Sequence, residues 1–101
     1  MATQVTWPVV APSSPGQVVA YTGTAGTIAN AIPSTATALW IFVTSIAHIR
    51  VGTSPTAVTT DFPLPANTPI IFPLTSNDGT LKVSAVQSAA GGNLHVCPIA
   101  Y

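Results

Sequence analysis

Charged side chains are almost missing from this sequence. Among 101 residues only four carry a formal charge, Arg50, Asp61, Asp78 and Lys82, and the net charge is zero. In an ordinary soluble domain about 25% of residues are charged. Nucleic acids and anionic membranes are bound through clusters of Lys and Arg, so neither is expected as a partner. A lone copy would also lack the repulsion that keeps small domains apart, which predicts that partner proteins cover part of the surface.

Cysteines and long apolar runs are equally scarce. The single cysteine, Cys97, excludes an intramolecular disulfide framework and is compatible with synthesis in a reducing cytoplasm. The longest strongly apolar run, residues 38–43, is far shorter than the roughly 18 residues that a membrane-spanning helix needs. The first residues contain no basic segment followed by an apolar block, so no secretory signal is expected.

Prolines and glycines, by contrast, recur along the whole chain. The 10 prolines and 7 glycines argue against long helices and for short strands joined by turns. Valine, isoleucine, threonine and aromatic residues fill the segments between them, as suits a pleated sheet. We therefore expect one all-β domain over residues 17–101, an antiparallel sandwich or barrel, with a small jelly-roll-like β-sandwich as the favoured form. Residues 1–16, with three prolines, are expected to form an extended N-terminal arm.

Alternating hydrophobicity predicts where the main strands lie. Residues 17–22, 27–32 and 70–72 are expected to be strands. The strongest alternation covers residues 39–51, either as one bent strand or as two strands that meet near Thr44 and Ser45. Its core-facing residues should be Leu39, Ile41, Val43, Ala47, Ile49 and Val51. Hairpin turns are expected at Asn77-Asp78-Gly79 and at Gly91-Gly92-Asn93, and an irregular loop or edge segment at residues 58–69.

No residue pattern indicates catalysis, a cofactor or a metal. His48, His95 and Cys97 are the only candidates for a zinc site, and they are more simply explained as an edge position and a small buried thiol. Asp61 is expected to accept backbone hydrogen bonds in its loop or to pair with Arg50. No nucleophile is accompanied by a base and an orienting acid. The chain is therefore not expected to be an enzyme.

From His48 onward the chain resembles a group of small bacteriophage virion proteins. The matching segments are HIRVGTSPTA (48–57), DFPLPANTP (61–69), KVSAVQ (82–87) and AAGGNLHV (89–96). The resemblance implies a structural component of the virion, with capsid decoration (cement) proteins as the nearest functional analogy. It further implies binding to the major capsid protein, self-association as a homotrimer, and a place on the capsid surface after synthesis in the host cytoplasm.

Exposed apolar character predicts the residues that contact partner proteins. These are the arm residues Val5, Trp7, Val9 and Val10, the pair Trp40 and Phe42, and the loop residues Phe62 and Leu64. The alternative function is a receptor- or glycan-binding module of a phage head or tail fibre. Its candidate residues are aromatic platforms and nearby amides, namely Trp7, Tyr21, Trp40, Tyr101, Asn30, Asn67 and Asn93.

Overall fold

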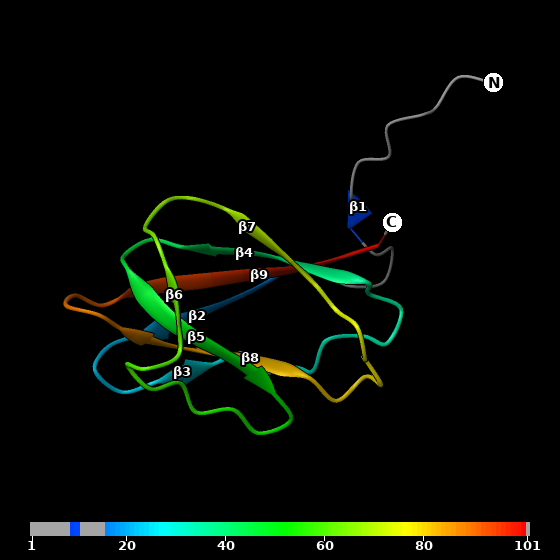
Figure 1. Cartoon of the computed structure of the whole chain (residues 1–101), viewed down its shortest axis with the longest axis horizontal. Helices are drawn as coiled ribbons and strands as arrows, with labels where there is room; N and C mark the ends of the chain where they lie inside the picture. Colours follow the sequence, from blue (N-terminus) through cyan, green and yellow to red (C-terminus); the bar gives the residue numbers. More distant parts are fainter. Residues whose placement is uncertain (1–8, 11–15, 101) are drawn as a thin grey trace, which may run out of the picture.

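The computed structural model describes residues 9–10 and 16–100, and this part of the chain consists of β-strands and loops without a helix (Figure 1). The predicted all-β class is therefore confirmed. The strands are β1 (Val9–Val10), β2 (Gln17–Tyr21), β3 (Gly26–Thr27), β4 (Ala38–Val43), β5 (Ala47–Gly52), β6 (Phe62–Leu64), β7 (Ile70–Pro73), β8 (Lys82–Gln87) and β9 (Gly92–Ala100). Val5 and Trp7 of the predicted arm lie outside the described residues.

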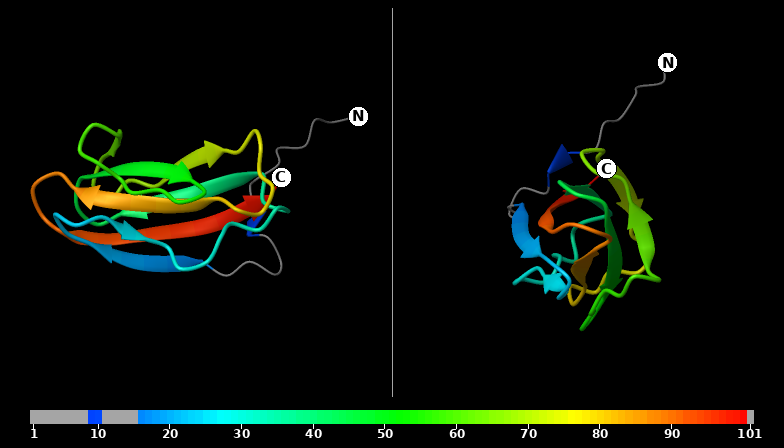
Figure 2. Two further views of the ribbon diagram at one scale, coloured as in Figure 1. Left: turned by 90° about the horizontal axis from the view of Figure 1, so that it is seen from below. Right: turned by 90° about the vertical axis from the view of Figure 1, so that its left-hand side faces the viewer.

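Two antiparallel sheets form a sandwich. Sheet A has the order β1-β9-β4-β7, with β2 also paired to β9, and sheet B has the order β3-β8-β5-β6. Strands β1 and β2 pair with successive parts of the same edge of β9, so each sheet is four strands wide. The end-on view in Figure 2 shows the strands surrounding a common interior. The predicted antiparallel β-sandwich is thus confirmed.

The strand pairs are nested along the chain. Strand β2 pairs with β9, β3 with β8, β4 with β7, and β5 with β6. Two further pairs, β4 with β9 and β5 with β8, join these nested pairs into the two sheets. Most contacts therefore connect segments far apart in sequence. Each sheet is complete only when strands from both halves of the chain pair with each other.

The core lies between the sheets and follows the predicted alternation in β4 and β5. Directly paired residues share one face of a sheet, so Leu39, Ile41 and Val43 lie beside Pro98, Val96 and Leu94. Other core residues come from sheet B and from the loops, among them Ile28, Ile32, Ala47, Ile49, Leu64, Val83 and Ala85. The prediction that Val51 is buried is wrong, because β6 pairs only with Ala47–Ile49 and leaves Val51 38% exposed.

Two predicted hairpins are also corrected. The segment Asn77-Asp78-Gly79 joins β7 of sheet A to β8 of sheet B. Gly91-Gly92 leads from β8 of sheet B back to β9 of sheet A. The local turn chemistry is nevertheless present, since Gly79 has a φ of 89°. The Asn77 amide donates to the carbonyls of Pro33 and Ala36, which fixes this loop to another one rather than to a hairpin partner.

The second predicted strand, residues 27–32, is shorter than expected. Only Gly26 and Thr27 form the ladder with β8. Beyond them, the backbone N–H groups of Ile28 and Ile32 donate to the carbonyls of Val83 and Leu81, at 3.0 and 2.6 Å. Both isoleucine side chains are buried, so the apolar signal at these positions reports the core and not a regular strand.

A buried tyrosine secures the corner where the chain passes from β4 to β5. Tyr21 is 2% exposed, and its hydroxyl donates to the carbonyl of Ser45 and accepts from the Ser45 N–H at 3.2 Å. Burial raises the pKa of the Tyr21 hydroxyl, which therefore stays protonated and keeps its donor role. The Tyr21 hydroxyl thus satisfies the backbone N–H and carbonyl of Ser45 at the turn that connects the two sheets.

Candidate protein-binding surface

The outer face of sheet A is apolar and aromatic. Because the inward positions of β4 and β9 are paired with each other, the alternate pairs, Trp40 with Cys97 and Phe42 with His95, point outward. Val18 of β2 lies beside His95 on the same side, and Ile71 of β7 lies beside Trp40. We name this surface the aromatic face and define it by six residues: Val18, Trp40, Phe42, Ile71, His95 and Cys97.

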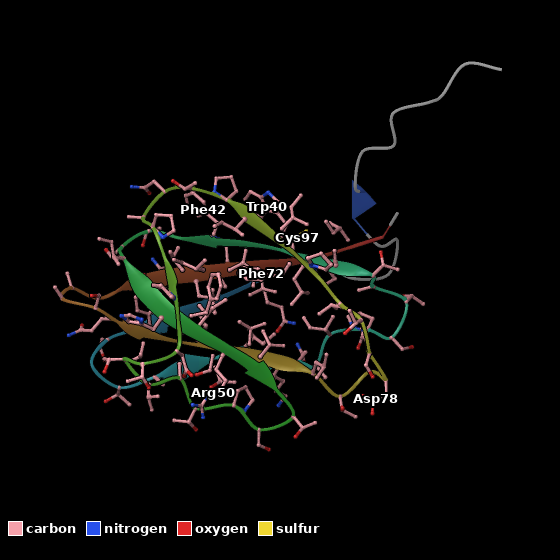
Figure 3. The ribbon with its side chains drawn as sticks, in the orientation of Figure 1. Trp40, Phe42, Arg50, Phe72, Asp78 and Cys97 are labelled. Carbon is pink, nitrogen blue, oxygen red and sulfur yellow. The ribbon has the colours of Figure 1, made fainter. Side chains whose placement is uncertain are left out.

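The rings on the aromatic face are already packed together. Trp40 and Phe42 stack with their planes 7° apart and their centroids separated by 5.9 Å, while His95 meets Phe42 edge-on at 5.7 Å. Figure 3 shows Trp40 and Phe42 side by side along β4. These rings are half-buried, and the flanking Val18 and Ile71 are 61% and 41% exposed. Aromatic residues without formal charge are typical of the centre of a protein interface.

No formal charge lies on the aromatic face. Arg50 and Asp61 lie on the outer side of sheet B, Lys82 starts β8 in the same sheet, and Asp78 lies in the loop between β7 and β8. Figure 3 shows Arg50 and Asp78 away from the Trp40 and Phe42 pair. A partner can therefore cover this face without removing any formally charged group of the chain from water.

Part of the outer face of sheet B is covered by the chain itself. The loop between β5 and β6 crosses it, where the N–H of Ala57 donates to the Ser84 hydroxyl at 3.0 Å and the Thr27 hydroxyl donates to the carbonyl of Pro55. Pro55, Ala57 and Ser84 are all buried as a result. The two outer faces therefore differ: the loop covers sheet B around Ser84 and leaves the charged Arg50 exposed, whereas the aromatic face keeps the apolar Val18 and Ile71 exposed.

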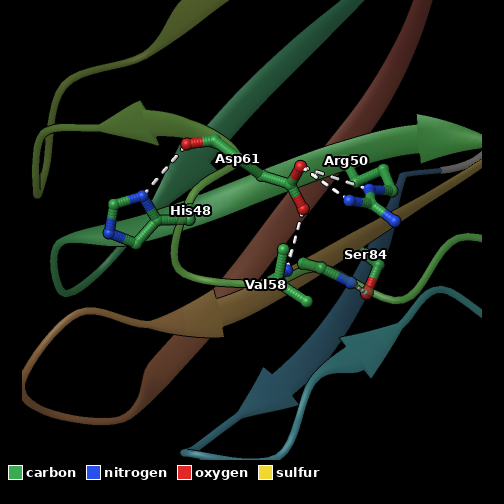
Figure 4. Close-up of polar contacts among 6 residues, drawn as sticks. His48, Arg50, Val58, Asp61 and Ser84 are labelled. Atoms are coloured by element: carbon green, nitrogen blue, oxygen red, sulfur yellow. Dashed lines mark hydrogen bonds and ion pairs between the residues drawn. The ribbon is translucent and has the colours of Figure 1, made fainter.

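The only ion pair among the described residues holds this loop in place (Figure 4). One oxygen of Asp61 accepts from the Arg50 guanidinium at 3.0 and 3.2 Å, and the other accepts from the N–H of Val58 at 2.8 Å. Both alternatives expected for Asp61 are thus present together. The Val58 N–H, and after it the Arg50 guanidinium, lower the pKa of the Asp61 carboxyl. The group is structural, since its partners are all within the chain.

Replacing Asp61 with asparagine should make stability depend less on acid pH. A carboxyl whose pKa is lowered on folding contributes stability above its unfolded pKa of about 3.9, and that contribution is lost as pH falls through the lowered value. The difference in unfolding free energy between wild type and D61N should therefore be largest near about pH 7 and shrink below about pH 4.

Urea unfolding of both proteins over this pH range measures the difference directly. The pKa of Asp78 is also lowered, chiefly by the Thr80 hydroxyl, but it titrates in both proteins and cancels. A difference that stays constant or grows on acidification would show that the Asp61 carboxylate does not stabilise the loop.

A second apolar patch closes one side edge of the sandwich. Phe62 on β6 and Phe72 on β7 belong to different sheets, and their rings meet edge-to-face with centroids 5.3 Å apart. Phe62 is 56% exposed although it lies on the same side of β6 as the core residue Leu64, two positions further along the strand. We name the pair Phe62 and Phe72 the phenylalanine edge.

The structure divides the predicted contact residues into three groups. Trp40, Phe42 and Phe62 lie on the two apolar patches. Leu64 is a correction: it is 1% exposed and packs in the core beside Ala47, on the same side of β6 as Phe62. Val9 and Val10 form β1, whose backbone pairs with Ala100 and Ile99 of β9. Val18, Ile71, His95 and Cys97 were missed because their common face depends on strand register.

The glycan and metal candidates are less well placed. Tyr21 is buried and cannot serve as a sugar platform, while Trp7 and Tyr101 lie outside the described residues. His95 and Cys97 do share one face, yet the described residues contain no group of three or more His, Cys, Asp or Glu side chains that could hold a metal ion. Burial raises the pKa of the Cys97 thiol, which favours its neutral form.

Neither a family model, a curated protein nor a solved structure matches this chain. In the described part of the chain there is also no helix able to cross a membrane. A proposal about function therefore depends on the chemistry of the aromatic face.

Proposed function

We propose that this chain is a non-enzymatic structural subunit of a virus particle, a decoration protein that binds the outer surface of a capsid and stabilises the shell. The observation that carries the proposal is the aromatic face: an ordered, uncharged, partly exposed set of side chains on a domain with four charged residues. Its partners are the major capsid protein and further copies of itself, assembled as a homotrimer. It is synthesised in the host cytoplasm and resides on the virion.

The aromatic face is suited to permanent contacts. The centres of protein interfaces are depleted of charge and enriched in aromatic residues. The part of the aromatic face around Trp40 and Phe42 has the same composition. Because their rings already stack on each other, less side-chain freedom is lost on binding than for flexible side chains. Stable attachment through buried apolar area, and not through ion pairs, follows from this composition.

The nested strand pairing supports the jelly-roll variety of sandwich. An antiparallel ribbon of eight strands, paired first with last and so inward, is wound so that its pairs alternate between two sheets. Jelly rolls are common in viral capsid proteins, which agrees with a virion role. A fold alone does not assign a function, so the proposal depends on the chemistry of the surface.

Attachment to particles should withstand high salt. Ion pairs between exposed groups are screened at about 1 M NaCl, where the Debye length is about 3 Å, whereas apolar contacts are not weakened. Particles carrying the protein are pelleted through about 1 M NaCl, and the bound fraction should equal that in dilute buffer. Release by salt alone would contradict attachment through the aromatic face.

A pair of variants connects attachment to the face itself. Trp40→Ala should lower occupancy on particles at least about tenfold, as expected for an aromatic residue at an interface centre. Ile46→Ala is the matched control, because Ile46 is 54% exposed in the turn after β4 and lies outside the aromatic face. Equal occupancy for both variants would remove Trp40 from the contact. Electron microscopy of the whole particle then locates the bound density.

Sugar binding is a distinguishable outcome of the same variants. A glycan array with the purified chain should give no signal, because Tyr21 is buried and the Trp40 ring is stacked on Phe42. A hit that Trp40→Ala abolishes would favour the receptor-binding alternative over capsid decoration.

A further inference from the structure

The aromatic face contains one side chain of a type that gains a charge in mild acid. His95 lies between two neighbours on this face, directly opposite Phe42 of β4 on one side and Val18 of β2 on the other. Its ring meets the Phe42 ring edge-on at 5.7 Å, and the residue is half-buried, so it remains accessible to water. Histidine is the residue type that changes charge between about pH 5 and 8. The aromatic face is therefore uncharged above this range and positively charged below it.

The strands around His95 offer no group that neutralises this charge. Its direct neighbours, Phe42 and Val18, are not titratable. The titratable residue nearest to it on its own strand is Cys97, and burial raises the pKa of the Cys97 thiol, which stays neutral over this range. Residues 1–16 contain no acidic or basic side chain. The titration of this face between about pH 5 and 8 therefore belongs to His95 alone.

Both acidic side chains of the protein are engaged elsewhere. Asp61 and Asp78 are the only acids in the sequence. Asp61 lies on the outer side of sheet B and accepts from Arg50. Asp78 lies in the loop between β7 and β8 and accepts from Thr80. A positive charge on His95 consequently has no carboxylate side chain of its own chain as a partner.

We propose that protonation of His95 releases the chain from the capsid, so that attachment is strong at neutral pH and weak in mild acid. The inference rests on the proposed function and adds the regulation of the aromatic face. A bound partner removes the remaining water from His95, and an ion buried without an opposite charge is strongly disfavoured. The bound form therefore excludes the proton that the free form accepts. Affinity is complete above the titration range and falls as pH decreases through it, by up to about tenfold per pH unit for one proton.

The second histidine of the chain supplies a matched control. His48 lies in sheet B, opposite Pro63 and Val86, and its Nδ1 lies 3.1 Å from the carbonyl oxygen of Asp61. It is the same residue type outside the aromatic face. His95→Gln and His48→Gln each replace one titratable ring with a neutral amide. Circular dichroism at both pH values establishes that each variant is folded.

Binding to particles is measured at about pH 7.5 and about pH 5.5 at constant ionic strength. Each variant is scored by the ratio of its two affinities, so a loss common to both pH values cancels, and a change in the particle surface affects all variants alike. Wild type and His48→Gln should bind about tenfold more weakly at the lower pH, and the ratio for His95→Gln should be close to one. Equal ratios for wild type and His95→Gln would overturn the proposal. Tighter binding of wild type in acid would also overturn it, because a partner carboxylate would then face His95.

Retention of the purified chain on phenyl-agarose tests the aromatic face without a capsid. At a constant concentration of ammonium sulfate, wild type and His48→Gln should elute earlier at the lower pH, and His95→Gln should elute at the same position at both. This pattern together with no particle binding at either pH would remove the decoration function and keep the pH response of the face. Particle binding of wild type that is equal at both pH values would keep the decoration function and remove the regulation by His95.

Discussion

Replacing Gly26 with alanine should strongly destabilise the domain. A Cβ at this position would lie 2.1 Å from the backbone oxygen of Ala20, at the edge where β3 of sheet B approaches β2 of sheet A. Neither backbone can move freely, because Gly26 pairs with Ala85 and Ala20 pairs with Asn93. Overpacking a core usually costs about 1–3 kcal/mol. Here the obstacle is main chain, so the cost should exceed about 3 kcal/mol and lower Tm by at least about 12 °C.

Gly52→Ala is the matched control for this substitution. Gly52 also lies in a strand, β5, but a Cβ there meets nothing within 4 Å. Its unfolding free energy should stay within about 0.5 kcal/mol of wild type, the usual range for surface positions. Thermal unfolding followed by circular dichroism compares the two variants. Equal melting temperatures for G26A and G52A would show that the β2 and β3 edges are not held as close as the structure has them.

Alternation in the sequence predicted burial better than it predicted pairing. Leu39, Ile41 and Val43 were placed in the core because a period of two reports which face of a strand is covered. The turns at Asn77–Gly79 and Gly91–Asn93 were expected to make hairpins, yet both connect different sheets. Asn, Asp and Gly favour a reversal of direction but do not specify which strand lies beside the next one.

The candidate surface was predicted only in part, for the same reason. Trp40 and Phe42 stood out as two large aromatic residues on the polar side of an alternating segment. Val18, His95 and Cys97 join them only through the register of β2 and β4 on β9. The covering of sheet B was also not predictable, since it depends on a hydrogen bond from Ala57 to the Ser84 hydroxyl across two distant segments. Long-range pairing therefore decides which face is left free.

Leu39→Ala and Val51→Ala should have very different effects, although the sequence pattern places both residues in the core. Leu39 is 0% exposed in β4, between Pro98 and Phe72 on the neighbouring strands, so its truncation leaves a cavity. Such substitutions cost about 2–5 kcal/mol. Val51 is 38% exposed beyond the end of β6, so removing its methyl groups should cost less than about 1 kcal/mol.

Urea unfolding distinguishes the two positions, because the transition midpoint should move strongly for L39A and little for V51A while the slope m stays constant for both. A large loss for V51A would mean that another segment or another copy covers Val51 in solution. The two explanations are separated by repeating both measurements over a wide range of protein concentration. If the V51A loss disappears at low protein concentration, the covering surface is a neighbouring copy; if it persists, the covering surface lies within the chain.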